Sequence, residues 1–432
     1  MMNYPKYESY KDSGIDWLGE IPSDWKQQSN KYIFKLKKTL VGNHSSDYVL
    51  LSLTLKGIIE RDMENPEGKF PAEFNTYQIV EKNDFVFCLF DVEETPRTVG
   101  LSEYNGMITG AYTVMEVSKH VSNKYFYYFY LNLDTDKRLK SLYTGLRNTI
   151  SKDSFFSFKS FVPPIQEQTL IAKFLDQKTS QIDEAIRIKE KQIELLKEQK
   201  QIMIQNAVTK GLDPNVKMKD SGVDWIGEIP EHWEVKRAKY LFTEVDERSK
   251  DGSEELLSVS HMTGVTPRSE KNVSMFMSED YTGSKLCKHN DLVINIMWAW
   301  MGALGVSNHK GIVSPSYGVF RQKQILSFHP AYLEFLLKTT KYIEHYNQVS
   351  TGLHSSRLRF YGHMFFAMKM GYPSYQEQEQ IVNFLTEKNS ETNNYIDVLE
   401  KQIEKLKEYK TTLINSAVTG KIKVTPEMVG EA

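Results

Sequence analysis

The sequence lacks several features that would assign it at once to a class of protein. Only two cysteines occur in 432 residues, Cys88 and Cys287, so neither a disulfide framework nor a cysteine-based metal site is expected. No apolar run approaches the roughly eighteen residues of a membrane span, and the first residues lack the basic and apolar regions of a signal peptide. We therefore expect a cytoplasmic protein with free thiols.

Catalytic motifs are missing as well. The chain has no GxxxxGK[ST] loop, no glycine-rich turn for a dinucleotide or for S-adenosylmethionine, and no Asn-Pro-Pro-aromatic tetrapeptide. Histidines are frequent in the second half, but none form an HExxH motif or an i, i+4 pair. We expect a chain without catalytic residues, bound metal or cofactor, which disfavours a self-contained methyltransferase or nuclease.

The net charge of −2 is unevenly distributed along the chain. Residues 26–160 carry 18 basic and 16 acidic side chains, and residues 234–370 carry 17 and 13. These segments sum to +6, so the rest of the chain carries −8. A basic excess confined to two segments is modest evidence for phosphate contact.

The most informative feature present is an internal repeat with a period of about 210 residues. The stretch KDSGIDWLGEIPSDW (Lys11–Trp25) returns as KDSGVDWIGEIPEHW (Lys219–Trp233), with eleven of fifteen positions identical. A longer pattern, QEQ…I…FL…KQIE.LKE.K…AVT, spans Gln166–Thr209 and Gln376–Thr419. A period of this length indicates two copies of a whole domain with its connector, around interiors that have diverged.

Each copy of the longer pattern predicts a helix. Prolines precede it, and Gly211 and Gly420 follow it. About forty residues at about 1.5 Å each give a helix of roughly 60 Å. A heptad seam runs along both copies and predicts a coiled coil between them; its positions are Ile186, Ile193, Leu196, Met203 and Ala207, and Ile396, Leu399, Ile403, Leu406, Leu413 and Ala417.

The direction of pairing follows from two lysines. Lys200 and Lys410 occupy equivalent seam positions and would repel each other in a parallel pair. Antiparallel packing separates them. The predicted fold is α+β, with two tandem domains joined by two long antiparallel coiled-coil helices related by a pseudo-two-fold axis, so that the domains lie inverted at opposite ends of the helix pair.

Within the divergent interiors, apolar runs at 85–90 and 292–297 predict buried strands, and 124–133 and 330–346 predict amphipathic helices. Their aromatic residues are expected in the core. The repeated segments around the two interiors form a shared frame, which the repeated tryptophans are expected to hold together. Those tryptophans are Trp17, Trp25, Trp225 and Trp233, whereas Trp298 and Trp300 occur only in the second half.

Over essentially its whole length, the chain resembles the specificity subunit of type I restriction-modification systems, because its repeated segments match that family's conserved motifs. GEIPxxW opens each half, and each half closes on VPPIQEQ with AVTKGL or on YPSYQEQ with AVTGKI. TGLRNTISKDSF and TGLHSSRLRF precede the closing boxes, as in that family. The resemblance implies target-recognition domains at 1–160 and 213–370, and conserved long helices at 161–212 and 371–432.

The resemblance further implies a non-catalytic subunit that recognises an asymmetric bipartite site in double-stranded DNA. Two modification (methyltransferase) subunits with S-adenosylmethionine, and restriction (motor-nuclease) subunits with ATP and Mg, would be its partners.

Base contacts are expected from loop residues of the divergent domains, because Arg and Lys suit guanine and Asn suits adenine. The alternative for each is a solvated charge or a phosphate contact. The candidates are Lys56, Arg61, Arg97, Arg147, Asn148 and Lys152 in the first half, and Arg268, Lys271, Lys285, Arg357 and Arg359 in the second.

Two other interpretations stay open on the sequence alone. A cytoplasmic coiled-coil adaptor without DNA specificity would show no salt-dependent affinity for DNA. A DNA-recognition chain from a fused or two-subunit restriction system would differ in its neighbouring genes.

Overall fold

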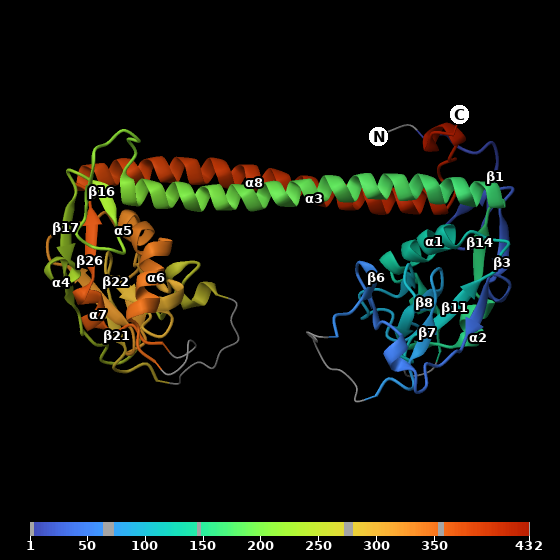
Figure 1. Cartoon of the computed structure of the whole chain (residues 1–432), viewed down its shortest axis with the longest axis horizontal. Helices are drawn as coiled ribbons and strands as arrows, with labels where there is room; N and C mark the ends of the chain where they lie inside the picture. Colours follow the sequence, from blue (N-terminus) through green and yellow to red (C-terminus); the bar gives the residue numbers. More distant parts are fainter. Residues whose placement is uncertain (1–3, 64–72, 145–147, 272–279, 353–357, 432) are drawn as a thin grey trace. The chain divides into compact units, whose positions relative to one another are not determined.

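The computed structural model describes residues 4–63, 73–144, 148–271, 280–352 and 358–431. The chain divides into two compact units, Met1–Glu190 with Glu400–Ala432, and Lys191–Leu399. Each unit contains one β-rich domain and part of each of two long helices, α3 (Ile165–Lys210) and α8 (Tyr375–Val418), drawn green and red in Figure 1. Two β-rich domains are thus joined by two long helices that pack together, as expected.

The helix boundaries agree with the sequence signals. α3 begins directly after Pro164 and ends one residue before Gly211, and α8 ends two residues before Gly420. Both glycines have positive φ, 79° and 71°, the left-handed conformation in which a side chain is disfavoured and which ends helices. Among the described residues, no helix combines the length and the apolar character that a membrane span requires.

α3 and α8 pack antiparallel. In the first unit Lys189 Nζ donates to Gln402 Oε1 at 2.6 Å, while Lys410 Nζ donates to Asp183 Oδ2 at 2.6 Å. Residue numbers therefore rise along one helix as they fall along the other.

The seam itself is buried or half-buried in both helices. In the second unit Lys200 Nζ donates to Asn393 Oδ1 at 2.9 Å, so both seam lysines have polar partners. The antiparallel coiled coil is confirmed.

The two β-rich domains share one sheet topology although their sequences have diverged. A four-stranded antiparallel sheet forms the centre of each, in the order β4-β11-β8-β9 and β18-β25-β22-β23. The strands of the first are β4 (Phe34–Lys37), β11 (Thr113–Val117), β8 (Phe85–Phe87) and β9 (Val99–Leu101), and those of the second are β18 (Phe242–Glu244), β25 (Gly318–Gln322), β22 (Leu292–Ile294) and β23 (Leu304–Val306).

Antiparallel strand pairs surround each central sheet, and four of them recur in both domains. In the first unit they are β1 (Tyr10–Asp12) with β2 (Glu20–Pro22), β3 (Lys26–Ser29) with β14 (Lys159–Val162), β5 (Leu51–Thr54) with β6 (Gly57–Glu60), β7 (Gln78–Val80) with β10 (Gly106–Ile108), and β12 (Tyr143–Thr144) with β13 (Thr149–Ile150). In the second they are β15 (Met218–Asp220) with β16 (Glu228–Pro230), β17 (Glu234–Arg237) with β26 (Lys369–Tyr372), β19 (Leu257–Ser260) with β20 (Gly264–Pro267), and β21 (Lys285–Cys287) with β24 (Gly311–Val313).

Short helices complete each domain: α1 (Asn123–Thr135) and α2 (Lys152–Ser157) in the first, and α4 (Ala238–Leu241), α5 (Pro330–Leu337), α6 (Thr340–Val349) and α7 (Gly362–Ala367) in the second. The single helix expected over 330–346 is wrong, because it breaks between α5 and α6. Thr339 has extended dihedrals and its hydroxyl donates to the Leu336 carbonyl, which satisfies the end of α5 as α6 starts.

The aromatic residues of the interiors form the core, as expected. The ring of Phe34 lies with its centroid 5.3–5.9 Å from five other buried rings, mostly edge to face. Those rings belong to Phe85, Phe87, Phe126, Tyr130 and Phe155.

Repeated tryptophans and the two QEQ boxes, residues 166–168 and 376–378 at the starts of the long helices, hold each domain on the helices. The buried indole of Trp25 donates from Nε1 to Glu167 Oε1 at 3.2 Å, and that of Trp233 donates to Glu377 Oε1 at 3.1 Å. An indole N–H removed from water needs such an acceptor. The expectation that the repeated tryptophans hold the frame is confirmed for Trp25 and Trp233. Trp17 is 39% exposed and lies under Arg138, and Trp225 stacks on His345.

The second glutamine of each QEQ box bridges to the β-rich domain. Gln168 Oε1 accepts from the backbone N–H of Ser122, and Gln378 Oε1 accepts from that of His329, both at 2.8 Å. Ser122 and His329 are the residues just before α1 and α5. Each glutamine also donates to the carbonyl of the proline five residues earlier, which fixes the entrance of the long helix against its domain.

The end of the partner helix makes a third equivalent contact. Tyr332 donates its buried hydroxyl to the carbonyl of Val208 at 3.0 Å. The buried hydroxyl of Tyr125, which donates to the Phe161 carbonyl at 3.1 Å, also lies 3.4 Å from the carbonyl of Val418. These carbonyls belong to the repeated AVT segments, so each domain contacts the beginning of one long helix and the end of the other.

Candidate nucleic-acid interface

In the first domain, the described candidate residues lie on three segments, and the loop that carries Arg97 contacts the other two. Lys56 is exposed at the tip of the β5–β6 hairpin, and the carbonyl of its neighbour Leu55 accepts from Arg97 Nη2 at 3.1 Å. The loop that carries Arg97 also contains Asp91, whose backbone N–H donates to the carbonyl of Asn148 at 2.9 Å. The structure therefore brings these candidates to neighbouring loops of one domain.

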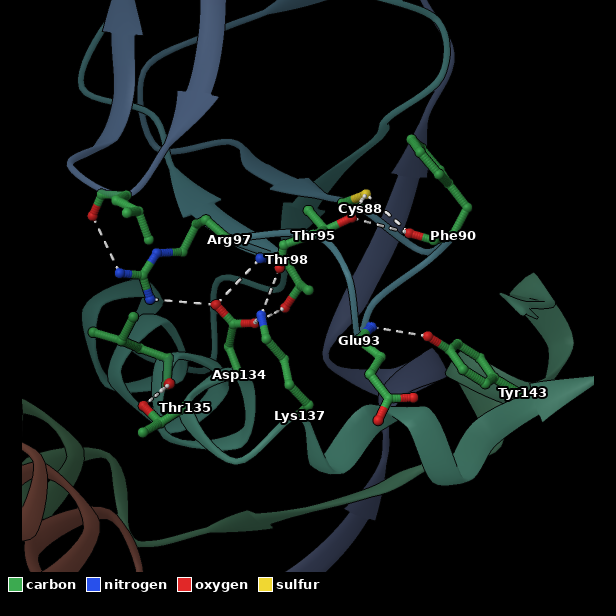
Figure 2. Close-up of polar contacts among 12 residues, drawn as sticks. Cys88, Phe90, Glu93, Thr95, Arg97, Thr98, Asp134, Thr135, Lys137 and Tyr143 are labelled. Atoms are coloured by element: carbon green, nitrogen blue, oxygen red, sulfur yellow. Dashed lines mark hydrogen bonds and ion pairs between the residues drawn. The ribbon is translucent and has the colours of Figure 1, made fainter. Parts of the chain in front are cut away.

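Arg97 is held in a buried polar network, shown in Figure 2. Its Nη1 lies 3.3 Å from Asp134 Oδ2, and Lys137 Nζ lies 2.8 Å from Oδ1 of the same carboxylate. Thr98 donates to Asp134 from both its backbone N–H and its hydroxyl. Because the Asp134 side chain is 1% exposed, its charge needs these partners. The guanidinium of Arg97 is therefore engaged within the protein.

The other candidates of this domain lie on the segments beside that network. Lys152 is exposed at the first position of α2, and Asn148 has a φ of 44°. Arg61 directly follows β6, and its backbone N–H donates to the carbonyl of Leu50 at 2.8 Å. Arg147 lies outside the described residues.

The second domain has a concavity of about 840 Å³ between the β19–β20 hairpin and the segment after β22. Its buried part includes Asn295, whose Nδ2 donates to the Tyr317 hydroxyl at 3.0 Å. Trp298, singled out in the sequence as unique to this half, lines the concavity with 45% of its surface exposed. The ring of Trp300 lies beside it, at 5.8 Å between centroids.

Two of the candidates stand together beside this concavity. Arg268 lines it, and Lys271 Nζ donates to the hydroxyl of Ser258, another lining residue, at 2.7 Å. Within the described part of the chain, neither cation forms an ion pair. Burial and the neighbouring charge of Arg268 lower the pKa of Lys271.

The remaining candidates of the second domain differ in their surroundings. Lys285 is buried, with its ammonium 4.0 Å from carboxylate oxygens of Glu244 and Asp246. Arg359 donates to the carbonyl of its own neighbour and is partly exposed. Arg357 lies outside the described residues.

Arg61 and Arg268 are structurally equivalent, a relation that the sequence analysis missed. The backbone N–H of Arg268 donates to the carbonyl of Leu256 at 2.8 Å, as that of Arg61 does to Leu50. The offsets were visible in the sequence, since 256 − 50 is 206 and 268 − 61 is 207, but the hairpins between these residues share too little sequence to align them.

Across the described ranges, no group of three histidine, cysteine or acidic side chains is placed to hold a metal ion. The features that gather on the divergent domains are instead cations, amides and an exposed tryptophan, the groups that contact phosphates and bases.

Comparison with known proteins agrees with this chemistry. Residues 22–198 match the family model described as type I restriction modification DNA specificity domain. The chain is 25% identical over 452 residues to the type I restriction enzyme MjaVIII specificity subunit of Methanocaldococcus jannaschii, covering 98% of both proteins.

Two solved structures share the fold at 12% identity. One belongs to work described as the structural basis of complex assembly and conformational transition of the type I R-M system, with a TM-score of 0.65 over 92% of this chain and 98% of that one. The other is the HsdS subunit from Thermoanaerobacter tengcongensis, with a TM-score of 0.51 over 93% and 98%.

Proposed function

Because the chain belongs to the specificity subunits of type I restriction-modification systems, the non-catalytic components that give these enzymes their DNA specificity, we propose that each β-rich domain recognises one half of a bipartite DNA site. The observation that carries this proposal is the combination of one shared frame with two different interiors. Trp, Gln and Tyr anchor both domains to α3 and α8 through equivalent hydrogen bonds. Because the two domains share these contacts to the helices but differ in their interiors, we expect them to recognise two different half-sites. The complete DNA site would then be asymmetric.

Within the first domain, the exposed residues are the best base-reading candidates. Lys56, Asn148 and Lys152 project from segments that the loop 88–98 ties together. Arg97 supports that surface through Asp134 and is a positioning residue in this proposal. We assign Lys285 the same positioning role in the second domain, since carboxylates of Glu244 and Asp246 lie 4.0 Å from its ammonium.

The long helices are the proposed attachment for the partner subunits. In the second unit, four apolar side chains of α3 and α8 are about half exposed, although the seam beside them is buried; they are Leu195, Ile202, Tyr395 and Val398. Exposed apolar residues on a helix pair suit further helices. We propose that modification subunits, carrying S-adenosylmethionine, bind here, and that restriction subunits using ATP and Mg join them in the cytoplasm.

The test is a map of methylated adenines in the source genome, compared between cells with and without this chain. Loss of one asymmetric bipartite motif from both strands would support the proposal and would give the target. An unchanged map, together with no salt-dependent DNA binding by the chain and its co-expressed modification subunit, would favour the adaptor alternative instead.

A further inference from the structure

Two neighbouring cations stand at the concavity of the second domain, Arg268 in its lining and Lys271 beside it. Neither forms an ion pair within the described residues, although Asp280 also lines the concavity. Arg268 and Lys271 are three residues apart around one short turn, and Lys271 is partly buried. The burial of Lys271 and, after it, the neighbouring charge of Arg268 disfavour the charged form of the lysine. An anion placed between them would remove this unfavourable energy.

The repeat indicates which part of DNA supplies that anion. Arg61 and Arg268 occupy the same position in domains that otherwise differ, with the same backbone hydrogen bond. Two half-sites of an asymmetric sequence differ in their bases but share the phosphodiester backbone. A residue present at one place in both domains suits the shared part, because phosphate contacts position a protein and base contacts specify a sequence.

The shape of the site favours a strand of the backbone as well. Base edges lie inside the grooves of a duplex, whereas the sugar-phosphate strands protrude from it. A concavity of about 840 Å³ lined by serine hydroxyls and one exposed indole accommodates a protruding strand better than a recessed edge. Trp298, which lines the same concavity and is 45% exposed, adds an apolar surface to these polar groups.

We propose that this concavity holds one strand of the DNA half-site, with a phosphate at Arg268 and Lys271 and the adjoining deoxyribose against Trp298. The proposal rests on the function proposed above and deepens it. Arg268 and Lys271 set the affinity and the register of the domain on DNA in this arrangement, and they leave the identity of the bases to other residues.

The salt dependence of binding separates a phosphate contact from a base contact. The full chain, with its co-expressed modification subunit, would be titrated with a duplex carrying the mapped motif and with a scrambled duplex, over a range of salt concentrations. For an Arg268→Ala, Lys271→Ala double variant we expect the slope of log K against log salt to fall by about 0.9, the contribution of one phosphate on B-DNA. The loss of affinity should be the same on both duplexes.

Four further variants accompany the double variant, and the first of them is its matched control. Lys288→Ala removes a cation of the same domain that Glu247 already neutralises at 2.7 Å, and it should leave the slope unchanged. Arg268→Lys keeps the charge and should keep most of the slope. Trp298→Ala should weaken binding severalfold at unchanged slope, because an apolar ring releases no counterion, and Trp298→Phe should restore much of the affinity.

Each outcome has one reading. A double variant with the wild-type slope, or one that methylates a motif relaxed at a single base pair, would overturn the phosphate assignment while leaving the proposed function intact. A wild-type chain that binds both duplexes equally would refute the proposed function, and the change in slope would still report on the phosphate site. A wild-type chain that binds neither duplex would refute both.

Discussion

At the scale of single residues, the buried carboxylate of Asp134 holds a surface loop of the first domain in place. Asp134 lies at the end of α1, and Arg97, Lys137 and Thr98 surround it with hydrogen bonds (Figure 2). A buried charge is tolerated only when it is paired, so these residues stabilise the loop 88–98. That loop in turn supports the exposed segments beside it.

The first prediction separates Arg97 from Lys56. Arg97→Ala should lower the free energy of unfolding of the first unit by about 3 kcal/mol, the lower end of the range for a broken buried ion pair, because Lys137 remains. Lys56→Ala should change it by less than about 0.5 kcal/mol, because Lys56 is exposed. Urea titration of both variants measures the difference. If Arg97→Ala kept its stability and lost recognition at one base pair, Arg97 would be a base contact after all.

The second prediction concerns the indole hydrogen bonds of the repeated frame. Glu377→Ala leaves the buried Nε1–H of Trp233 without its acceptor, which should cost about 1–3 kcal/mol. Glu379→Ala is the matched control, because Glu379 is exposed two positions further along the same helix. Thermal unfolding followed by tryptophan fluorescence compares the two. Equal melting temperatures would mean that the Trp–Glu contact contributes nothing to holding the domain.

At the scale of elements, the long helices place chemically identical residues in opposite environments. Leu413 is 3% exposed in the seam, whereas Leu195 is 51% exposed on α3. Both are leucines in helix interiors, so truncation to alanine alters helix propensity alike and differs only in packing.

The third prediction follows from that pair. Leu413→Ala should destabilise the first unit by about 2–5 kcal/mol, whereas Leu195→Ala should stay within about 0.5 kcal/mol of wild type. Leu195→Ala should instead weaken the proposed association with the modification subunit, measured by titration with the purified partner. If Leu195→Ala bound the partner normally, the exposed apolar residues of α3 would not be part of that interface.

The elements also show how far the sequence could predict this structure. The long helices, their glycine ends and their direction followed from local signals and from two lysines, because coiled coils repeat a short-range pattern. The break at Thr339 and the engagement of Arg97 by Asp134 could not be predicted, since both depend on contacts across the fold. Arg97 and Asp134 are 37 residues apart and no motif links them.

The shared strand order of the two interiors was hidden for a related reason. Strand pairing tolerates many sequences provided the buried face stays apolar. β8 and β22 are buried strands as predicted, although each covers only the first three residues of its predicted run. Nothing in their residues identified their neighbours in the sheet. The candidate DNA-binding residues were the hardest to predict, since a sequence does not distinguish an exposed arginine from one that is paired with a carboxylate.

At the scale of the whole molecule, the repeat separates what is common from what is specific. The anchoring contacts are duplicated: indole to glutamate, backbone to glutamine, and tyrosine to the carbonyl of the AVT segment. The strands β3 and β14 close the first interior, and β17 and β26 close the second in the same antiparallel register. Each interior is therefore bounded by equivalent strands.

The last prediction uses this equivalence. A chimera in which residues 234–372 replace residues 26–162 carries the second interior in both frames. Tyr332 and His329 then supply the contacts that Tyr125 and Ser122 make in the first frame, so the chimera should fold with all three anchors intact. Cells that express it with the modification subunit should methylate a motif in which both halves have the sequence of the second half-site, as shown by adenine methylation mapping. A chimera that folds, by circular dichroism and thermal melting, but retains the wild-type asymmetric motif would show that specificity resides outside the interiors, in the frame that both halves share.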